Sequence, residues 1–158
     1  MRRIAPIIII VAIAAGFLYW WFSPVQIIKR QTENFLEIIT LQASASPARR
    51  QLGGYSLNAI LGEQVILENS TIPEANGTFD RAELESAYAW LCQQARHTRF
   101  DLTRFRSVAV EAKQATVSFT LSALVELPTY RPADGTYEVV FDWQKADDGW
   151  RLTAARWK

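Results

Sequence analysis

The longest uninterrupted apolar stretch of the chain lies at its N-terminal end. Ile4 to Phe22 reads IAPIIIIVAIAAGFLYWWF and contains no charged residue, and two arginines precede it. About 19 residues in helical conformation measure roughly 28 Å, close to the thickness of a bilayer's hydrocarbon core. The stretch ends in aromatic residues, which are typical of membrane interfaces: Tyr19, Trp20 and Trp21. The pattern predicts a transmembrane anchor in residues 1–23 and a globular domain in residues 24–158.

A cleavable signal peptide is the alternative interpretation of this segment. Arg2 and Arg3 would form its charged start, and Ala12-Ile13-Ala14 has the small-x-small form of a cleavage site. Cleavage there would leave an apolar region of only about eight residues, whereas the apolar run continues to Phe22, which favours an uncleaved anchor. A short N-terminal tail and a long following domain favour an inside N-terminus and an outside domain, either periplasmic or extracellular.

Three pairs of residues mark the starts of helices after the apolar stretch. Ser23-Pro24 combines a cap residue with a proline in the first turn, and apolar residues at three- and four-residue spacing continue to about Leu41. Ser46-Pro47 starts a shorter helix in the same way. Asp80, with Glu83 three residues later, forms a capping-box pattern, and its helix is expected to continue to about residue 96.

The second half of the chain alternates between apolar and polar residues, as strands do. The expected strands have turn residues between them: Phe105–Glu111, Ala115–Leu127, Thr136–Gln144 and Trp150–Trp157. A brief apolar run at residues 65–67 indicates one more short strand. Helices first and then a meander of strands predict an α+β fold, with helices on one face of a curved antiparallel sheet.

Alternation also assigns side chains to the two faces of this sheet. Val117, Phe119 and Leu121 are expected to face the core, which places Ser118 and Ser122 on the outward face. The same parity places Trp157 on the outward face, opposite to the inward residues Trp150 and Leu152. A face of small hydroxyl side chains is either a plain solvent surface or a packing surface for a second copy or a partner. Tyr130 and Arg131, in the loop before residue 135, are further interaction candidates because both types are enriched at binding hot spots.

Composition excludes several classes of function. The whole chain carries 17 basic and 16 acidic residues, so it lacks the basic excess that is typical of nucleic-acid binding. With one histidine and one cysteine, and without a zinc or nucleotide-binding motif, we expect no metal and no cofactor. The single cysteine, Cys92, has no partner for an internal disulfide and is expected to be a buried, inert thiol.

Three stretches carry a resemblance to a known family. They are the run EQVIL before a loop and the helix from Asp80, the strand pair around Val108 and Ala115–Leu127, and the ending KADDGWRL at residues 145–152. Together they resemble the nuclear transport factor 2-like superfamily, which includes ketosteroid isomerase and the SnoaL-like cyclases. The resemblance covers Pro24 to Trp157 and implies a cone-shaped fold. Because the superfamily contains enzymes, ligand binders and assembly modules, some of them membrane-anchored, the fold alone does not select a function.

Enzymes of this family act inside the cone with Asp, His, Tyr or Arg side chains. The candidates here are Tyr88, His97, Asp101 and Tyr137, and His97 with Asp101 four residues later could form an oriented general base. We favour a histidine that merely complements the negative end of a helix, where Arg96 and Arg99 flank it. The inward face of the longest strand is wholly apolar and offers no buried carboxylate base. The sequence therefore favours a membrane-tethered, non-enzymatic module that dimerises or binds a protein partner. The alternative is a small apolar ligand binder or an isomerase-like enzyme that uses the cone cavity.

Overall fold

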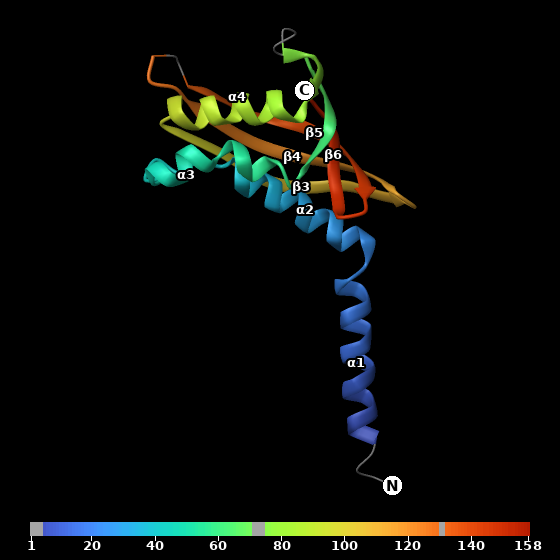
Figure 1. Ribbon diagram of the computed structural model, residues 1–158. Helices are drawn as coiled ribbons and strands as arrows, with labels where there is room; N and C mark the ends of the chain where they lie inside the picture. Colours follow the sequence, from blue (N-terminus) through green and yellow to red (C-terminus); the bar gives the residue numbers. More distant parts are fainter. Residues whose placement is uncertain (1–4, 71–74, 130–131) are drawn as a thin grey trace.

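The computed structural model describes residues 5–70, 75–129 and 132–158 (Figure 1). Its helices are α1 (Ala5–Trp21), α2 (Pro24–Ile39), α3 (Pro47–Leu52), the 3-10 helix η1 (Gly54–Leu57) and α4 (Arg81–Gln94). Its strands are β1 (Leu61–Asn69), β2 (Gly77–Asp80), β3 (His97–Glu111), β4 (Gln114–Glu126), β5 (Ala133–Ala146) and β6 (Gly149–Trp157). The predicted α+β arrangement is confirmed.

Helix α1 projects away from the other elements, and only the start of α2 connects it to them (Figure 1). The side chains of residues 13–22 are exposed, and the rings of Phe17, Trp20 and Trp21 lie 5.8–6.3 Å apart between centroids. The sequence predicted a membrane-spanning helix here. The helix has 17 residues, and within the described ranges no helix combines the length and the apolar character that crossing a membrane requires.

Helix α2 begins and packs as its sequence predicts. The Ser23 hydroxyl accepts a hydrogen bond from the Gln26 N–H at 3.4 Å, and Pro24 occupies the first helical position. Ile28, Thr32 and Leu36 follow one another at four-residue spacing and are buried against the sheet. The helical period of the apolar positions thus directs one stripe of α2 into the core.

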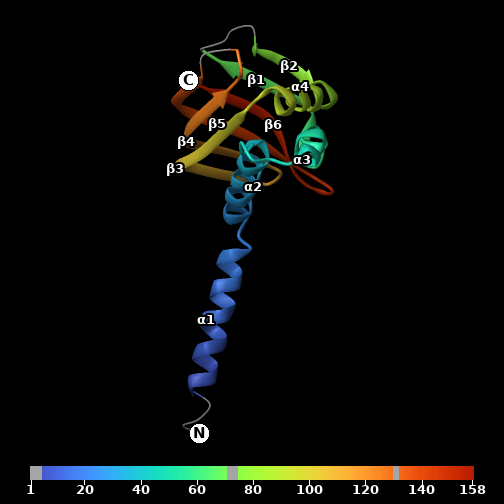
Figure 2. The same ribbon diagram turned by 90° about the vertical axis from the view of Figure 1, so that its left-hand side faces the viewer.

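The six strands form one sheet in the order β2-β1-β6-β5-β4-β3 (Figure 2). All neighbouring pairs are antiparallel except β1 and β6, which are parallel, so the sheet is mixed rather than wholly antiparallel as the sequence analysis expected. The difference comes from β1, which was expected only as a short strand or edge segment and instead extends over nine residues and pairs with β6 in parallel. The chain between β1 and β6, which includes α4, supplies the long connection that parallel neighbours need.

The core lies between one face of this sheet and helices α2 and α4. Val117 and Phe119 of β4 face Phe141 and Val139 of β5, as the alternation predicted, and all four are at most 5% exposed. The ring centroid of Phe141 lies 5.0 Å from that of Phe119 in an edge arrangement, which is favourable for aromatic pairs. Cys92 of α4 is buried in the same core, as expected.

Strand β3 begins eight residues earlier than the sequence predicted. The segment after α4 was expected to continue the helix to about residue 96, but α4 ends at Gln94 and β3 starts at His97. Thr98 explains the early start: its hydroxyl donates to the Ile39 carbonyl at 2.9 Å, and its backbone exchanges hydrogen bonds with Leu41. Contacts with the end of α2 therefore draw this segment into the sheet, and local helical preference does not decide its conformation.

A β-bulge in β6 reverses the predicted orientation of Trp157. Trp143 pairs with Leu152 and Asp142 pairs with Ala154, so Thr153 is an extra residue on β6. From there on the parity changes, and Trp157 packs partly buried against the core. The prediction of an outward Trp157 is wrong because a one-residue bulge moves every following side chain to the other face.

Candidate functional site

The four candidate catalytic side chains are not brought together. His97 and Asp101 lie on the same strand, where four residues correspond to roughly 13 Å. Asp101 pairs instead with Arg99 at 3.0 Å. The general base that helical spacing would have allowed is therefore not assembled, because this segment is a strand.

The two tyrosines are occupied by packing and by a backbone contact. The Tyr88 hydroxyl donates to the Ile38 carbonyl at 2.8 Å, and burial, followed by the neighbouring Cys92, raises the pKa of Tyr88 far above its ordinary value. The Tyr137 ring packs back onto Gly135 of its own strand. Tyr88 is thus a hydroxyl that joins α4 to the end of α2 and stays protonated near neutral pH.

An apolar pocket of about 280 Å³ lies between the sheet and the helices that cover it. Its walls come from α2, η1, β1, α4 and β6, and every lining residue except Tyr88 is apolar: Phe35, Leu57, Leu61, Val65, Leu67, Leu84, Ala87, Tyr88, Leu91, Leu152 and Ala155. Such a wall can hold a small apolar molecule. It offers no carboxylate or imidazole for proton transfer, and among the described residues no three His, Cys, Asp or Glu side chains gather as a metal site.

The outward face of the sheet carries a different kind of surface. On β5 the carboxylate of Asp142 accepts hydrogen bonds from the Thr116 hydroxyl at 2.9 Å and from the Arg156 guanidinium at 2.6 Å. This row of β4, β5 and β6 side chains is half-exposed, with Arg156 and Asp142 at 40% and 30%. The charges are therefore held at fixed positions on an open surface.

A second row of charges crosses the same face nearer the end of β6. Glu138 receives the Arg106 guanidinium at 2.6 Å and the Lys158 ammonium at 3.9 Å, and Arg106 also donates to the Thr120 hydroxyl. Arg106 reaches this row because it is the extra residue of a bulge in β3. Alternation alone did not reveal the rows, since each depends on side chains from three strands and on the register between them.

Ser118 lies between these two rows, directly opposite Val140. Both line a hollow of about 960 Å³ that also contains Ile66, whose side chain is 44% exposed. Ser122 lies four residues further along β4, opposite Thr136 and Asp101. The two predicted serines therefore share the outward face, and Ser118 is the one placed at its hollow.

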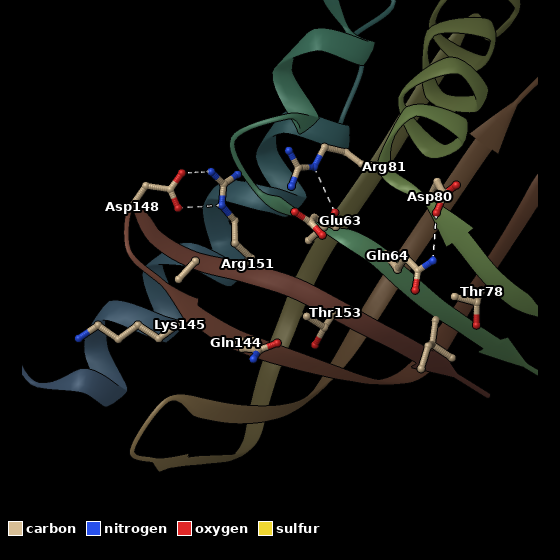
Figure 3. A pocket seen from close by; sticks show the side chains of 13 residues that line it. Glu63, Gln64, Thr78, Asp80, Arg81, Gln144, Lys145, Asp148, Arg151 and Thr153 are labelled. Carbon is tan, nitrogen blue, oxygen red and sulfur yellow. Dashed lines mark hydrogen bonds and ion pairs between the residues drawn. The ribbon is translucent and has the colours of Figure 1, made fainter.

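A second hollow of about 970 Å³ adjoins the first, because Ile66 and Thr78 line both. Figure 3 shows the side chains that line this second hollow. Arg151 donates to the Asn58 carbonyl at 2.7 Å and pairs with Asp148, and this hydrogen-bonded guanidinium lowers the pKa of Asp148. Arg81 donates to the Gly62 carbonyl at 3.1 Å. Both arginines are thus anchored to backbone carbonyls beside the hollow that they line.

The remaining interaction candidates differ in what the structure describes. Tyr130 and Arg131 lie outside the described residues. Trp157 faces the core but its edge still lines the hollow beside Ser118. Ile66, Arg106, Glu138, Asp142 and Arg156 were missed by sequence reasoning. These charged and apolar residues stand at outward strand positions in the sequence. They could be recognised as one surface only once the strand order was known.

Comparison with known proteins assigns the fold. No protein-family model matches the chain, and no curated protein matches it. A solved NTF2-like protein from Cytophaga hutchinsonii is 14% identical, with a TM-score of 0.65, over 87% of this chain and 98% of its own. An NTF2-like superfamily protein from Salmonella enterica is 13% identical (TM-score 0.61, covering 83% and 87%), and the CaMKII hub of S. rosetta is 14% identical (TM-score 0.60, covering 86% and 96%). The chain has the NTF2-like cone fold.

Proposed function

We propose that this chain is a non-enzymatic interaction module that associates with a membrane through α1 and forms a homodimer through the outward face of its sheet. The observation that carries this proposal is the contrast between the two faces of the sheet. The inward face lines an apolar pocket that offers no carboxylate or imidazole, while the outward face presents two adjoining hollows and fixed charges. Chemistry is therefore poorly supported inside the cone, and recognition is well supported outside it.

The charge pattern of the outward face fits a second copy of the same surface. A two-fold interface brings one patch against itself, so it must carry both charges in complementary places. The rows around Asp142 and Glu138 each carry both signs of charge, which is the first part of this requirement. The hollow beside these rows leaves room for the second copy to approach closely. It is lined by small and apolar side chains: Ser118, Val140 and Ile66. One solved protein of this fold is named as a hub, which agrees with an assembly role.

The membrane association follows from the exposed apolar surface of α1. Residues 13–22 leave several large apolar side chains exposed: Ile13, Phe17, Leu18, Trp20, Trp21 and Phe22. Contact with water costs roughly 25 cal/mol for each Å² of such surface, and a run of exposed large apolar side chains indicates an interaction site. A membrane removes this cost without a specific protein partner.

The dimer proposal is tested by isolating one copy of the full chain with a second, differently tagged copy from detergent-solubilised membranes. Ser118→Arg places an extra positive charge on this face, and in a two-fold dimer it lies near the same charge of the other copy. Because the two charges repel each other, we expect recovery of the second copy to fall more than about tenfold. Gln93→Arg adds the same charge on the exposed side of α4 and should change nothing. Unchanged recovery with Ser118→Arg would show that this face is not the interface.

A second function, binding of a small apolar molecule, is favoured only by the 280 Å³ pocket. Benzene is a suitable probe because it is small and apolar, like the walls of this pocket. Binding would raise the Tm of the wild type, and Ala87→Phe, which fills the pocket from α4, would abolish the increase. An equal Tm increase in both proteins would place the probe elsewhere.

A further inference from the structure

The junction between α1 and α2 concentrates positive charge beside aromatic side chains. We call Trp20, Trp21, Lys29 and Arg30 the α1–α2 corner. The first acidic residue of the whole sequence is Glu33, so the chain up to that point carries only basic charges. The first turn of α2 likewise contains no acidic residue. The corner therefore presents positive charge next to the apolar helix, and the first acidic side chain, Glu33, lies about one helical turn beyond it.

Arg30 is held in place at this corner by Trp21. Its guanidinium carbon lies 4.5 Å from the centre of the Trp21 ring, and one of its terminal nitrogens donates to the Trp21 carbonyl at 3.1 Å. This contact uses one of the five N–H donors of a guanidinium. In the described ranges no carboxylate forms an ion pair with Arg30 or Lys29. The Lys29 ammonium lies over the Phe105 ring, 5.3 Å from its centre.

A guanidinium fixed in this way is preorganised for phosphate. Its planar fork matches phosphate oxygens, and stacking on an aromatic ring limits the conformational entropy that binding would cost. The same Trp21 ring belongs to the exposed cluster with Phe17 and Trp20 on α1. Tryptophan is enriched at the level of lipid headgroups, where one side of the ring is apolar and the other is wet. The corner thus joins a phosphate-binding group to an interfacial aromatic cluster.

We infer that the α1–α2 corner binds the headgroups of anionic phospholipids, with the Arg30 guanidinium on a lipid phosphate and Lys29 adding attraction to the charged surface. This inference rests on the proposed membrane association of α1 and specifies which lipids the chain prefers. Lipid phosphate is favoured over a soluble phosphate because the charge lies directly at the end of the apolar helix. When α1 is in the hydrocarbon, Trp21 and Arg30 reach the headgroup layer together.

The experiment reconstitutes the full chain by detergent removal in the presence of vesicles and measures flotation. One set of vesicles contains phosphatidylcholine alone, and the other contains phosphatidylcholine with phosphatidylglycerol. We expect the wild type to float with both and to prefer the anionic set. Arg30→Gln should reduce that preference about fivefold, the contribution of one basic side chain near an anionic surface, without changing flotation with the neutral set. Arg30→Lys should retain part of the preference because it keeps the charge but not the fork.

Several results would overturn the inference, and they separate it from the proposal on which it rests. Equal flotation of the wild type with both vesicle sets would reject headgroup preference and leave membrane association standing, whereas no flotation with either would reject both. Arg96→Gln is the control, because it removes an exposed arginine that is paired with Glu126 and lies far from the corner in sequence. If Arg96→Gln reduced the preference for anionic vesicles as much as Arg30→Gln does, the effect would be one of net charge. Inorganic phosphate and sodium chloride are compared at equal ionic strength. If only phosphate abolished the preference for anionic vesicles, the corner would be a binding site for soluble phosphate.

Discussion

Thr98 shows how much of this fold depends on single buried polar groups. Its side chain is completely buried, and its hydroxyl donates to the Ile39 carbonyl while accepting the Leu41 N–H, both at 2.9 Å. The hydroxyl thereby satisfies the backbone where α2 ends and joins it to β3. A buried carbonyl that loses its donor costs more than the hydrogen bond contributes.

Thr98→Val keeps the shape of the side chain and removes the hydroxyl. We expect the free energy of unfolding of the full chain to fall by about 1–3 kcal/mol, since the Ile39 carbonyl is left without that donor. Urea unfolding followed by circular dichroism measures the change. Thr103→Val, at an exposed position of the same strand, should stay within about 0.5 kcal/mol of wild type. Equal losses in both variants would contradict a special role for Thr98.

Gly53 is required for a different reason, the close approach of the Cys92 side chain. A Cβ added at Gly53 would clash with the Cys92 Sγ, although the φ of −53° at Gly53 is acceptable for any residue. Gly53→Ala is therefore expected to destabilise the fold by about 1–3 kcal/mol through overpacking alone. Cys92→Ala in the same chain removes the clashing sulfur, so the double variant should lose less than the two single losses added together. Strict additivity in this double-mutant cycle would refute the clash.

At the scale of elements, α3 connects the C-terminal ends of two longer helices. Arg50 donates to the Cys92 carbonyl at 2.8 Å and to the Ala95 carbonyl at 2.6 Å at the end of α4, and Arg49 donates to the Ile38 carbonyl at the end of α2. These carbonyls carry the negative end of each helix dipole. A short helix that buries none of its own side chains is thus held mainly by two adjacent arginines and the glycines that follow.

Arg50→Gln should lower the free energy of unfolding by about 2 kcal/mol, because hydrogen bonds from a charged donor to buried carbonyls are lost. Arg49→Gln is the matched control: Arg49 is exposed and makes one such contact at 3.2 Å, so its loss should be under about 1 kcal/mol. Thermal unfolding of both variants at equal concentration compares them. A larger loss for Arg49→Gln would mean that α3 is held by its contact with α2.

Element boundaries and faces show what the sequence could and could not predict. The caps at Ser23 and Asp80 and the alternation of β4 depend on neighbours within a few residues, and the structure confirms them. The orientation of Trp157 depends on the bulge at Thr153, and the start of β3 depends on Thr98 reaching α2. Both involve partners far away in sequence, so local periodicity carries no signal for them. The charged rows of the outward face likewise required the strand order.

At the scale of the whole molecule, the layers separate three environments. The apolar helix α1 projects from one end of the domain (Figure 2), the cone interior is apolar, and the charged sheet face is open to solvent. This division supports attachment through the helix and recognition through the sheet. It also explains why the predicted catalytic residues do not form a site, since His97 and Asp101 lie on a strand and Tyr88 is used for packing.

The mass of the full chain in detergent tests the proposed dimer most directly. Light scattering, with the detergent contribution subtracted, measures the protein mass without any variant. One chain has a mass of 18.0 kDa, and we predict a particle that contains twice this protein mass. Ser118→Arg should return it to the mass of a single chain while the circular dichroism spectrum stays unchanged. A wild-type particle with the mass of one chain at every concentration tested would contradict assembly through the outward sheet face.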